Sequence, residues 1–294
     1  MKLNLFKSLF LLLLPVCAQA QTDTTDLFGL MGNNDETDYA TATFKTTRLM
    51  NGHSIENQAK GVLDFHINHR FGNVNGGTYE WFGLDQANVK LGLDYGITPW
   101  LMVGIGRTNV DKTVDGFVKA KILRQSTGKK NHPVSITYMA AAAATTLKWA
   151  DPNRNNYGTS RFNYTNQILI ARKFSNATSL QLMPTLVHRN LIDSSKFKND
   201  VFIIGIGGRQ KLTQRVSVNF EYYYVLPNQI SKTYNNSLSL GFDIETGGHV
   251  FQLHFTNSRG MTDPQFLTQT VGDWLKGDIR FGFNVSRVFT ITDH

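Results

Sequence analysis

The sequence predicts an all-β protein: one transmembrane antiparallel up-and-down β-barrel of about twelve strands, set in the outer membrane of a Gram-negative bacterium. Three observations predict this fold. Segments from Gly61 onward alternate between apolar and polar residues, tight turns alternate with longer connections, and the chain opens with an export signal. Barrel strands show a period of two because alternate side chains face lipid and the interior.

The N-terminus has the composition of a secretory signal peptide. Lys2 and Lys7 give a basic start, an apolar stretch covers residues 9–16, and a small-residue cleavage site ends at Ala20. We therefore expect cleavage after Ala20. Cys17 is the only cysteine, so the exported chain would have none and could form no disulfide.

The bulk composition excludes two classes of protein. The 294 residues are 41% hydrophobic, and no apolar run is long enough to cross a bilayer as a helix. The formal charge of +8 becomes +6 without Lys2 and Lys7, and the remaining basic residues are spread along the chain. A nucleic-acid-binding protein would gather them on one face, so we expect no nucleic-acid partner. The oligomeric state stays open.

Three regions follow from the pattern along the chain. Residues 1–20 form the signal peptide, residues 21–60 a polar N-terminal segment, and residues 61–294 the barrel. The polar segment is acidic at first and reads as mobile. Its last part, residues 43–61, is the place where a short strand or a plug-like element could occur.

The alternation is clearest at the start of the barrel region. In GVLDFHINHRFG, Leu63, Phe65 and Ile67 share one parity, while Asp64 and His66 share the other. A strand with one apolar and one charged face fits lipid outside and a polar interior. The same alternation recurs in the segments 86–97, 161–174, 179–189, 216–226, 237–245, 251–255 and 278–289.

Short and long connections alternate between these segments, which orients the barrel. Outer-membrane barrels have short periplasmic turns and longer extracellular loops, so an even number of strands places both ends in the periplasm. The alternation is imperfect at 108–112, where a loop is short, and at 125–133, where a turn is long. Tight turns are expected near 98–99, 175–178, 212–215 and 246–249, and long loops near 72–83, 148–159, 191–199, 227–236 and 259–276.

The inward parity collects charged residues of both signs. One interpretation is a lumen that passes polar solutes, as rings of charge do in pores. The other is a network of salt bridges that fills a narrow barrel, since interior charges must be paired or hydrated. Parity leaves both open. The predicted lumen-facing residues are Asp64, His66, Arg70, Lys90, Asp94, Lys119, Lys121, Arg161, Lys173, Arg189, Glu221, Asp243, Glu245, His254, Asp278 and Arg280.

Motifs for cofactors and metals are weak. The glycines at 104–106 and 205–208 lie inside predicted strands, whereas a phosphate loop needs a helix directly after it. His66 and His69 stand three apart, which places them on opposite faces of a strand. We therefore expect no cofactor and no metal.

A lipid-active hydrolase is the enzyme hypothesis to weigh, because some barrels of this size are phospholipases with a lipid-facing serine and histidine. His188 is outward by parity and near a strand end, and Ser194 and Ser195 lie in the adjoining loop. The nucleophile-elbow pattern G-x-S-x-G is missing from the sequence. An interfacial histidine explains His188 better, so we expect no enzyme.

Several stretches are similar to a known family. FKTTRLMNGHSIE, GVLDFHINHRFG, LGLDYGITPWLMVGIGR, LQLMPTLVHRN and especially GGHVFQLHFTNS resemble an uncharacterised outer-membrane β-barrel family that is common in Bacteroidetes. The resemblance covers about residues 43–290. It implies an outer-membrane location, and it implies no activity, ligand or catalytic residue, because the family has none assigned.

Two functions remain from different classes. The first is a channel or porin-like pore for small polar solutes, which rests on the charged inward face. The second is a non-conducting structural or partner-binding barrel of an envelope complex. Its contact sites would be the acidic N-terminal segment and the long loop 258–277, besides the outer-membrane lipid around the barrel.

Overall fold

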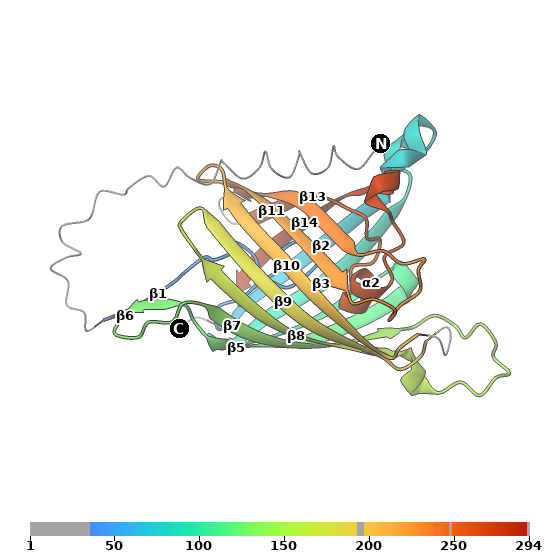
Figure 1. Ribbon diagram of the computed structural model, residues 1–294, viewed down its shortest axis with the longest axis horizontal. Helices are drawn as coiled ribbons and strands as arrows, with labels where there is room; N and C mark the ends of the chain where they lie inside the picture. The colour runs from blue at the N-terminus through green and yellow to red at the C-terminus, as the bar shows by residue number, and fades with distance from the viewer. Residues whose placement is uncertain (1–35, 193–196, 247–248, 293–294) are drawn as a thin grey trace.

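A computed structural model of the chain describes residues 36–192, 197–246 and 249–292. Within them, twelve antiparallel strands form a closed barrel (Figure 1), which confirms the predicted fold class and strand number. The expected signal peptide and its cleavage site lie outside the described residues. In the described part of the chain, no helix is both long and apolar enough to cross a membrane.

The strands follow one another around the barrel in chain order, and β14 pairs with β2 to close it, with Val285 opposite Ile67. A two-stranded sheet of β1 (Thr37–Tyr39) and β6 (Ser126–Gly128) lies outside this ring. The barrel strands are β2 (Val62–Asn73), β3 (Ala87–Thr98), β4 (Leu101–Thr108), β5 (Thr113–Leu123), β7 (Ser135–Thr145), β8 (Phe162–Lys173), β9 (Thr178–Arg189), β10 (Asp200–Lys211), β11 (Val216–Val225), β12 (Ser237–Thr246), β13 (His249–Thr256) and β14 (Arg280–Thr290).

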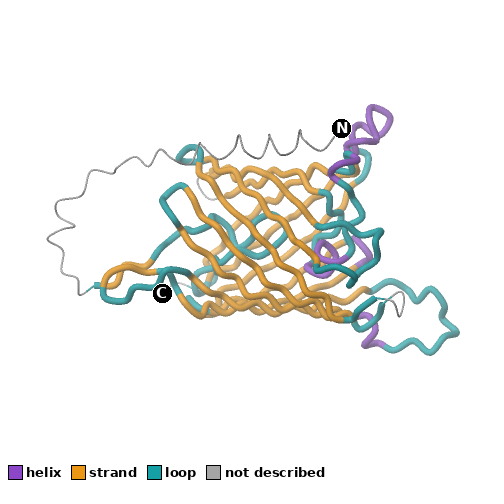
Figure 2. Tube along the Cα trace, viewed as in Figure 1, coloured by secondary structure: helices purple, strands orange, loops and turns teal. Residues whose placement is uncertain are grey.

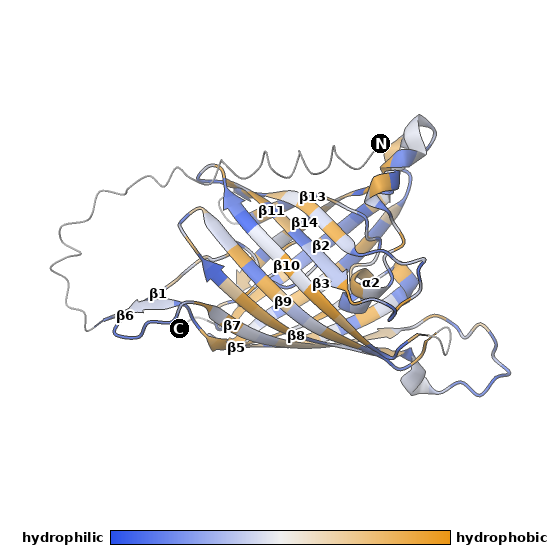
Figure 3. Cartoon of the chain, viewed as in Figure 1, coloured by the Kyte–Doolittle hydropathy of each residue, from blue (hydrophilic) through white to orange (hydrophobic). Residues whose placement is uncertain are grey.

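Polar side chains point into the barrel and apolar side chains point out. On β3, Lys90 and Asp94 are buried, whereas Leu91 is 48% exposed and Leu93 is 39% exposed. The alternating bands along the strands in Figure 3 show the same pattern around the wall. This is the reverse of a soluble protein, and it gives the apolar outer surface that a bilayer requires.

The two ends of the barrel differ, as the sequence predicts. Long connections and the short helices gather at one end, which we call the long-loop end (Figure 2). Turns such as 174–177 and 212–215 form the other, the short-turn end. The two expected exceptions are present: η3 (Val110–Lys112) fills a short loop, and the long turn after β5 contains β6.

Two segments fill the interior. Residues 43–56, called the plug below, run from the short-turn end into the barrel (the blue chain in Figure 1) and are almost entirely buried. Residues 257–272, the cap, fold back into the long-loop mouth and include the helix α2 (Asp263–Thr268). The cap is mostly buried, so the long loop 258–277 is not the freely exposed contact site that the scaffold hypothesis expects.

One side of the interior wall is apolar, and the positions of the charged residues alone do not reveal it. On β8–β11 the inward residues include Leu169, Met183, Val187, Val201 and Ile203, all buried and packed together. The charged residues lie mainly on β2–β5 and β11–β14. The lumen is therefore amphipathic rather than uniformly polar, because one sector supplies an apolar core.

The orientation of the barrel can be tested with single cysteines. We expect a membrane-impermeant maleimide to label Asn153→Cys, in the long loop after β7, on intact cells. Asn176→Cys, in the tight turn after β8, should react only after the cells are opened. Labelling of Asn176→Cys alone on intact cells would reverse the assigned orientation.

Candidate functional site: the plugged lumen

The plug is a β-hairpin whose tip lies inside the barrel. Arg48 and His53 form an isolated antiparallel bridge, and the Leu49 N–H donates to the Gly52 carbonyl at 2.8 Å. The Ser54 N–H donates to the Thr47 carbonyl at 3.0 Å, which extends the hairpin. A hairpin this short leaves most of its backbone groups without partners of their own, and buried groups of that kind need them.

Glu221 on β11 holds the hairpin tip. Its carboxylate accepts the N–H of Asn51 at 2.8 Å and of Gly52 at 3.1 Å, and more loosely the N–H of Met50 at 3.4 Å. The Glu221 side chain is 0% exposed. An isolated buried carboxylate is costly, so these charge-assisted hydrogen bonds stabilise both the wall residue and the plug.

The other backbone groups of the tip bind wall side chains from strands around the barrel. Gln252 on β13 donates to the Leu49 carbonyl at 2.7 Å. Asn284 on β14 donates to the Met50 carbonyl at 2.9 Å. On the opposite side, Gln181 of β9 donates to the His53 carbonyl at 2.8 Å. The wall thus supplies the sheet-like partners that the short hairpin lacks.

Side chains of the plug are fixed in the same way. Arg70 on β2 donates to the Asn51 side-chain oxygen at 3.0 Å, and the Asn51 amide donates to Ser239 on β12 at 2.9 Å. The Lys119 ammonium on β5 donates to the carbonyls of Ser54, at 3.1 Å, and of Glu56. Arg70, Lys119 and Glu221 are fully buried, so these predicted lumen residues bind the plug rather than water.

The apolar side of the hairpin packs on the apolar sector of the wall. Leu49 and Ile55 belong to the same buried cluster as Met183 and Tyr223. Gly52 passes so close to the Tyr223 hydroxyl that a Cβ there would lie 1.7 Å from it. The plug is therefore matched to the lumen in both polarity and shape.

The cap meets the plug from the opposite end. The side chain of Gln265 accepts from the Thr262 N–H at 3.4 Å and donates to Thr113 on β5 at 3.1 Å. Phe266 packs its ring 5.3 Å from that of Tyr223. α2 is short, and these contacts rather than its own length hold it in place.

Plug and cap touch at His53 and Asp263. The His53 Nε2 lies 3.7 Å from an Asp263 carboxylate oxygen, and both side chains are buried. Burial, together with the nearby Arg48 guanidinium, lowers the pKa of His53 to about 3. His53 is therefore neutral at pH 7, and its ring packs edge-on against Phe117 with the centroids 4.5 Å apart.

One buried ion pair and one buried histidine–carboxylate hydrogen bond lie on the polar side of the wall. The Lys90 ammonium is 2.5 Å from Asp115, and the His66 Nε2 is 3.2 Å from Asp94. These pairs satisfy part of the salt-bridge interpretation from the sequence. Other polar side chains of the wall form hydrogen bonds with the plug. Neither a water-filled pore nor a pure salt-bridge network therefore describes this lumen.

The predicted lumen-facing residues fall into three groups. Inward and buried are Asp64, His66, Arg70, Lys90, Asp94, Lys119, Arg189, Glu221, Asp243, His254 and Arg280. Partly exposed near the short-turn rim are Lys121, Lys173 and Glu245.

Arg161 and Asp278 do not face the lumen from strands. Arg161 ends the short helix η4 (Gly158–Arg161), donates to the Thr145 and Leu147 carbonyls and stacks on Trp149. Asp278 lies in the loop before β14 and accepts from Asn75 at 2.7 Å. Both precede the first residue of their strand, and the inward–outward parity holds only within strands.

Several interior residues were missed by the sequence analysis. Asp115 and Arg209 share the inward parity of their strands and could have been found by it. Arg48, His53 and Asp263 could not, because they lie in the plug and the cap, where the sequence has no period of two. The structure alone places them in the lumen.

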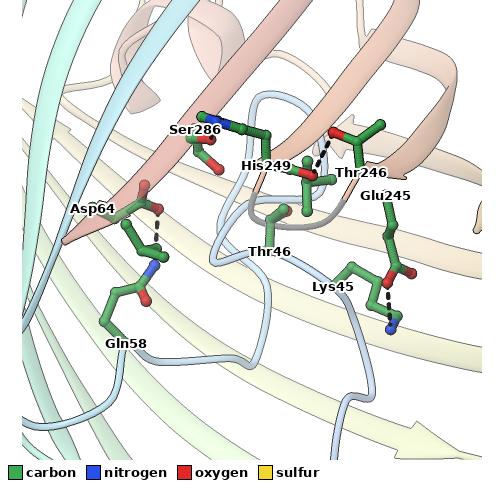
Figure 4. A pocket seen from close by; sticks show the side chains of 10 residues that line it. Lys45, Thr46, Gln58, Asp64, Glu245, Thr246, His249 and Ser286 are labelled. Atoms are coloured by element: carbon green, nitrogen blue, oxygen red, sulfur yellow. Dashed lines mark hydrogen bonds and ion pairs between the residues drawn. The ribbon is translucent and has the colours of Figure 1, made fainter. Parts of the chain in front are cut away.

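A pocket of about 340 Å³, the vestibule, opens at the short-turn end between the plug and the wall (Figure 4). Lys45 pairs with Glu245 at 2.9 Å on one side, and Gln58 donates to Asp64 at 2.8 Å on the other. A deeper void of about 20 Å³, enough for a water molecule, continues from it. The residues that line both are Thr46, Asp64, Val250 and Ser286.

His188 is on the outer face, as parity predicts. Its Nδ1 lies 2.7 Å from an Asp200 carboxylate oxygen, and its side chain is 42% exposed. Ser194 and Ser195, the candidate nucleophiles, lie outside the described residues. Among the described residues, no hydroxyl forms a hydrogen bond with His188.

Comparison with known proteins gives a family and distant structural likenesses. Residues 44–289 match the family described as a membrane-bound beta barrel domain, DUF5777. No curated protein matches the chain. Among solved structures, it is similar to the NanC porin (7% identity, TM-score 0.47, covering 79% of this chain and 100% of that one). It is also similar to the KdgM porin (10%, 0.45, 79% and 99%) and to the outer membrane protein Omp33 of Acinetobacter baumannii (7%, 0.42, 81% and 100%). At such low identities and scores, these likenesses carry no argument about a solute.

The close approach of Gly52 to Tyr223 gives a test of plug seating. Gly52→Ala should destabilise the folded barrel by about 1–3 kcal/mol, the usual cost of overpacking. Its backbone is not in the left-handed region, so the clash is the main penalty. Adding Tyr223→Phe removes the clashing hydroxyl and should recover part of the loss. Equal stability of Gly52→Ala and the unmodified protein, measured by thermal unfolding in detergent, would mean that the plug is not seated there.

Proposed function

We propose that this chain, which belongs to the DUF5777 family of membrane-bound beta barrel domains, is a gated channel of the outer membrane that rests in a closed state. The observation that carries the proposal is how the lumen is closed. A separate hairpin fills it together with the cap, and hydrogen bonds to wall side chains hold that hairpin in place. Such bonds exchange readily with water, each at a net cost of roughly 0.5–1.5 kcal/mol.

The plug can be withdrawn without breaking the barrel. It is joined to β2 through residues 57–61, and its barrel partners are side chains rather than the backbone ladder. The strand ladder closes without it, from β14 to β2. The vestibule beside it already admits solvent from the short-turn end, along β12–β14 and β2. Opening would widen this seam, with the plug as the moving part.

After withdrawal of the plug, the polar side of the barrel wall would suit the passage of small polar solutes. Asp64, Asp94 and Lys119 would line the opened path together with Arg70 and Glu221, so both signs of charge would be present. Opposed charges in a narrow passage orient and select polar molecules. The charged side chains of the wall thus support small polar solutes as the class that the channel would pass.

The second candidate is a non-conducting barrel that binds an envelope partner. The filled lumen favours this second candidate, because a barrel that never conducts can keep its interior permanently filled. Most of the cap is buried. The surface with which the barrel could bind a partner would therefore be limited to exposed residues such as Leu275 and to the small β1–β6 sheet. Neither candidate includes a catalytic step.

Single-channel recording in planar bilayers separates the two. The unmodified protein should give rare conductance steps, and a variant lacking residues 43–56 should give sustained ones. Glu221→Ala removes the acceptor for two close N–H groups, so it should raise the open fraction by about tenfold or more.

Asp85→Ala, an exposed carboxylate in the loop before β3, is the matched control and should behave as the unmodified protein does. Folding of each variant is checked by circular dichroism and heat-modifiable gel mobility. A folded variant without residues 43–56 that never conducts would refute the channel and leave the partner-binding barrel.

A further inference from the structure

The outer face of the barrel carries an apolar groove that neither the channel nor the plug explains. It has a volume of about 370 Å³, within the range of about 300–1,000 Å³ for small-molecule pockets. It crosses β7–β10, with Pro184 between Ile168 and Ile204. Leu186 and Phe202 continue it toward the long-loop end, and its lining is almost wholly apolar.

Pro184 explains why the wall is hollowed here. Proline has no N–H to donate to a strand ladder. The pairing of β8 with β9 accordingly passes from Gln167 opposite Thr185 directly to Ile170 opposite Leu182. The short proline ring lies low between two β-branched neighbours, which form the sides of the groove.

The groove lies where a lipid chain would run. Its exposed residues, such as Phe202 at 52% and Ile204 at 48%, belong to the outward apolar face of the strands. It rises from the middle of β8 and β9 toward the loop after β9. One pair further along the same outward face, Asp200 lies opposite His188, and their side chains are hydrogen-bonded at 2.7 Å.

One polar group opens into the groove. The Asn166 side-chain oxygen accepts from the Tyr138 hydroxyl at 2.6 Å. Its amide nitrogen makes no hydrogen bond to any residue within the described ranges. A donor without an acceptor is unfavourable at membrane depth, where no water is present to accept it. An ester carbonyl or hydroxyl of a lipid would satisfy it.

We propose that this groove binds one acyl chain of a membrane lipid from the leaflet on the long-loop side. The chain lies over Pro184 between Ile168 and Ile204. The lipid's polar head lies beside the His188–Asp200 pair, where the ring nitrogen of His188 that faces away from Asp200 contacts the headgroup. A second copy of this chain is the other conceivable occupant. The membrane depth, the narrow concave form and the polar His188–Asp200 pair at one end fit a lipid better.

Native mass spectrometry of the full chain, released from detergent with added dioleoyl phosphatidylethanolamine, tests this site. The unmodified protein should retain one lipid more tightly than the rest. Ile204→Trp fills the groove and should lower that retention by about tenfold, the factor that losing roughly two buried methylene contacts gives. His188→Ala should lower it less, because it removes only the headgroup contact.

Ile206→Trp is the matched control, since Ile206 is an outward residue of the same strand that does not line the groove. It should retain lipid as the unmodified protein does, and circular dichroism shows that each variant is folded. Equal retention in Ile204→Trp and Ile206→Trp would overturn the proposal. A dimer that Ile204→Trp dissociates would also overturn it and assign the groove to a second copy.

Discussion

The carboxylate of Glu221 and the hairpin tip that it binds are the contact on which the closed lumen depends. A charged group at the centre of a narrow barrel needs partners, because too little water reaches it. The N–H groups of Asn51 and Gly52 supply them, and neither of those groups has a partner within the hairpin. Wall and plug therefore satisfy each other, and each would be costly without the other.

The wall and the plug also depend on each other because the lumen is amphipathic. The apolar residues on β8–β11 would face water in an empty barrel, and the plug and the cap cover them with Leu49, Ile55 and Phe266. On the polar side, Lys119 and Gln252 bind plug carbonyls that would otherwise be unpaired. The plug is therefore held by packing on one side and by exchangeable hydrogen bonds on the other.

Much of the fold could be predicted from the sequence, because strand parity is a local property. The alternation within a few positions of Asp64 and Lys90 predicts that both point inward, and both side chains are buried. The plug could only be suspected, since its partners are distant: Glu221 lies 170 positions from Asn51. For the cap, the sequence predicts only a long loop, because residues 257–272 have no alternation and their burial depends on the barrel that surrounds them.

Parity also failed where strands end. Arg161 and Asp278 have the inward parity but precede the strands, and their side chains bind loop groups instead. The apolar side of the lumen was overlooked for a different reason. Charged residues make up only part of the inward face, whereas Met183 and Ile203 have the same inward orientation and pack against the plug.

Hydrogen exchange of the plug amides in the membrane-inserted protein tests the central claim most directly. The N–H groups of residues 49–54 should exchange as slowly as those of the barrel strands, because wall acceptors and burial protect them. Residues 151–156, in the exposed loop after β7, give the fast reference in the same sample. Exchange of residues 49–54 at the rate of that loop would show that the hairpin is not held in the lumen.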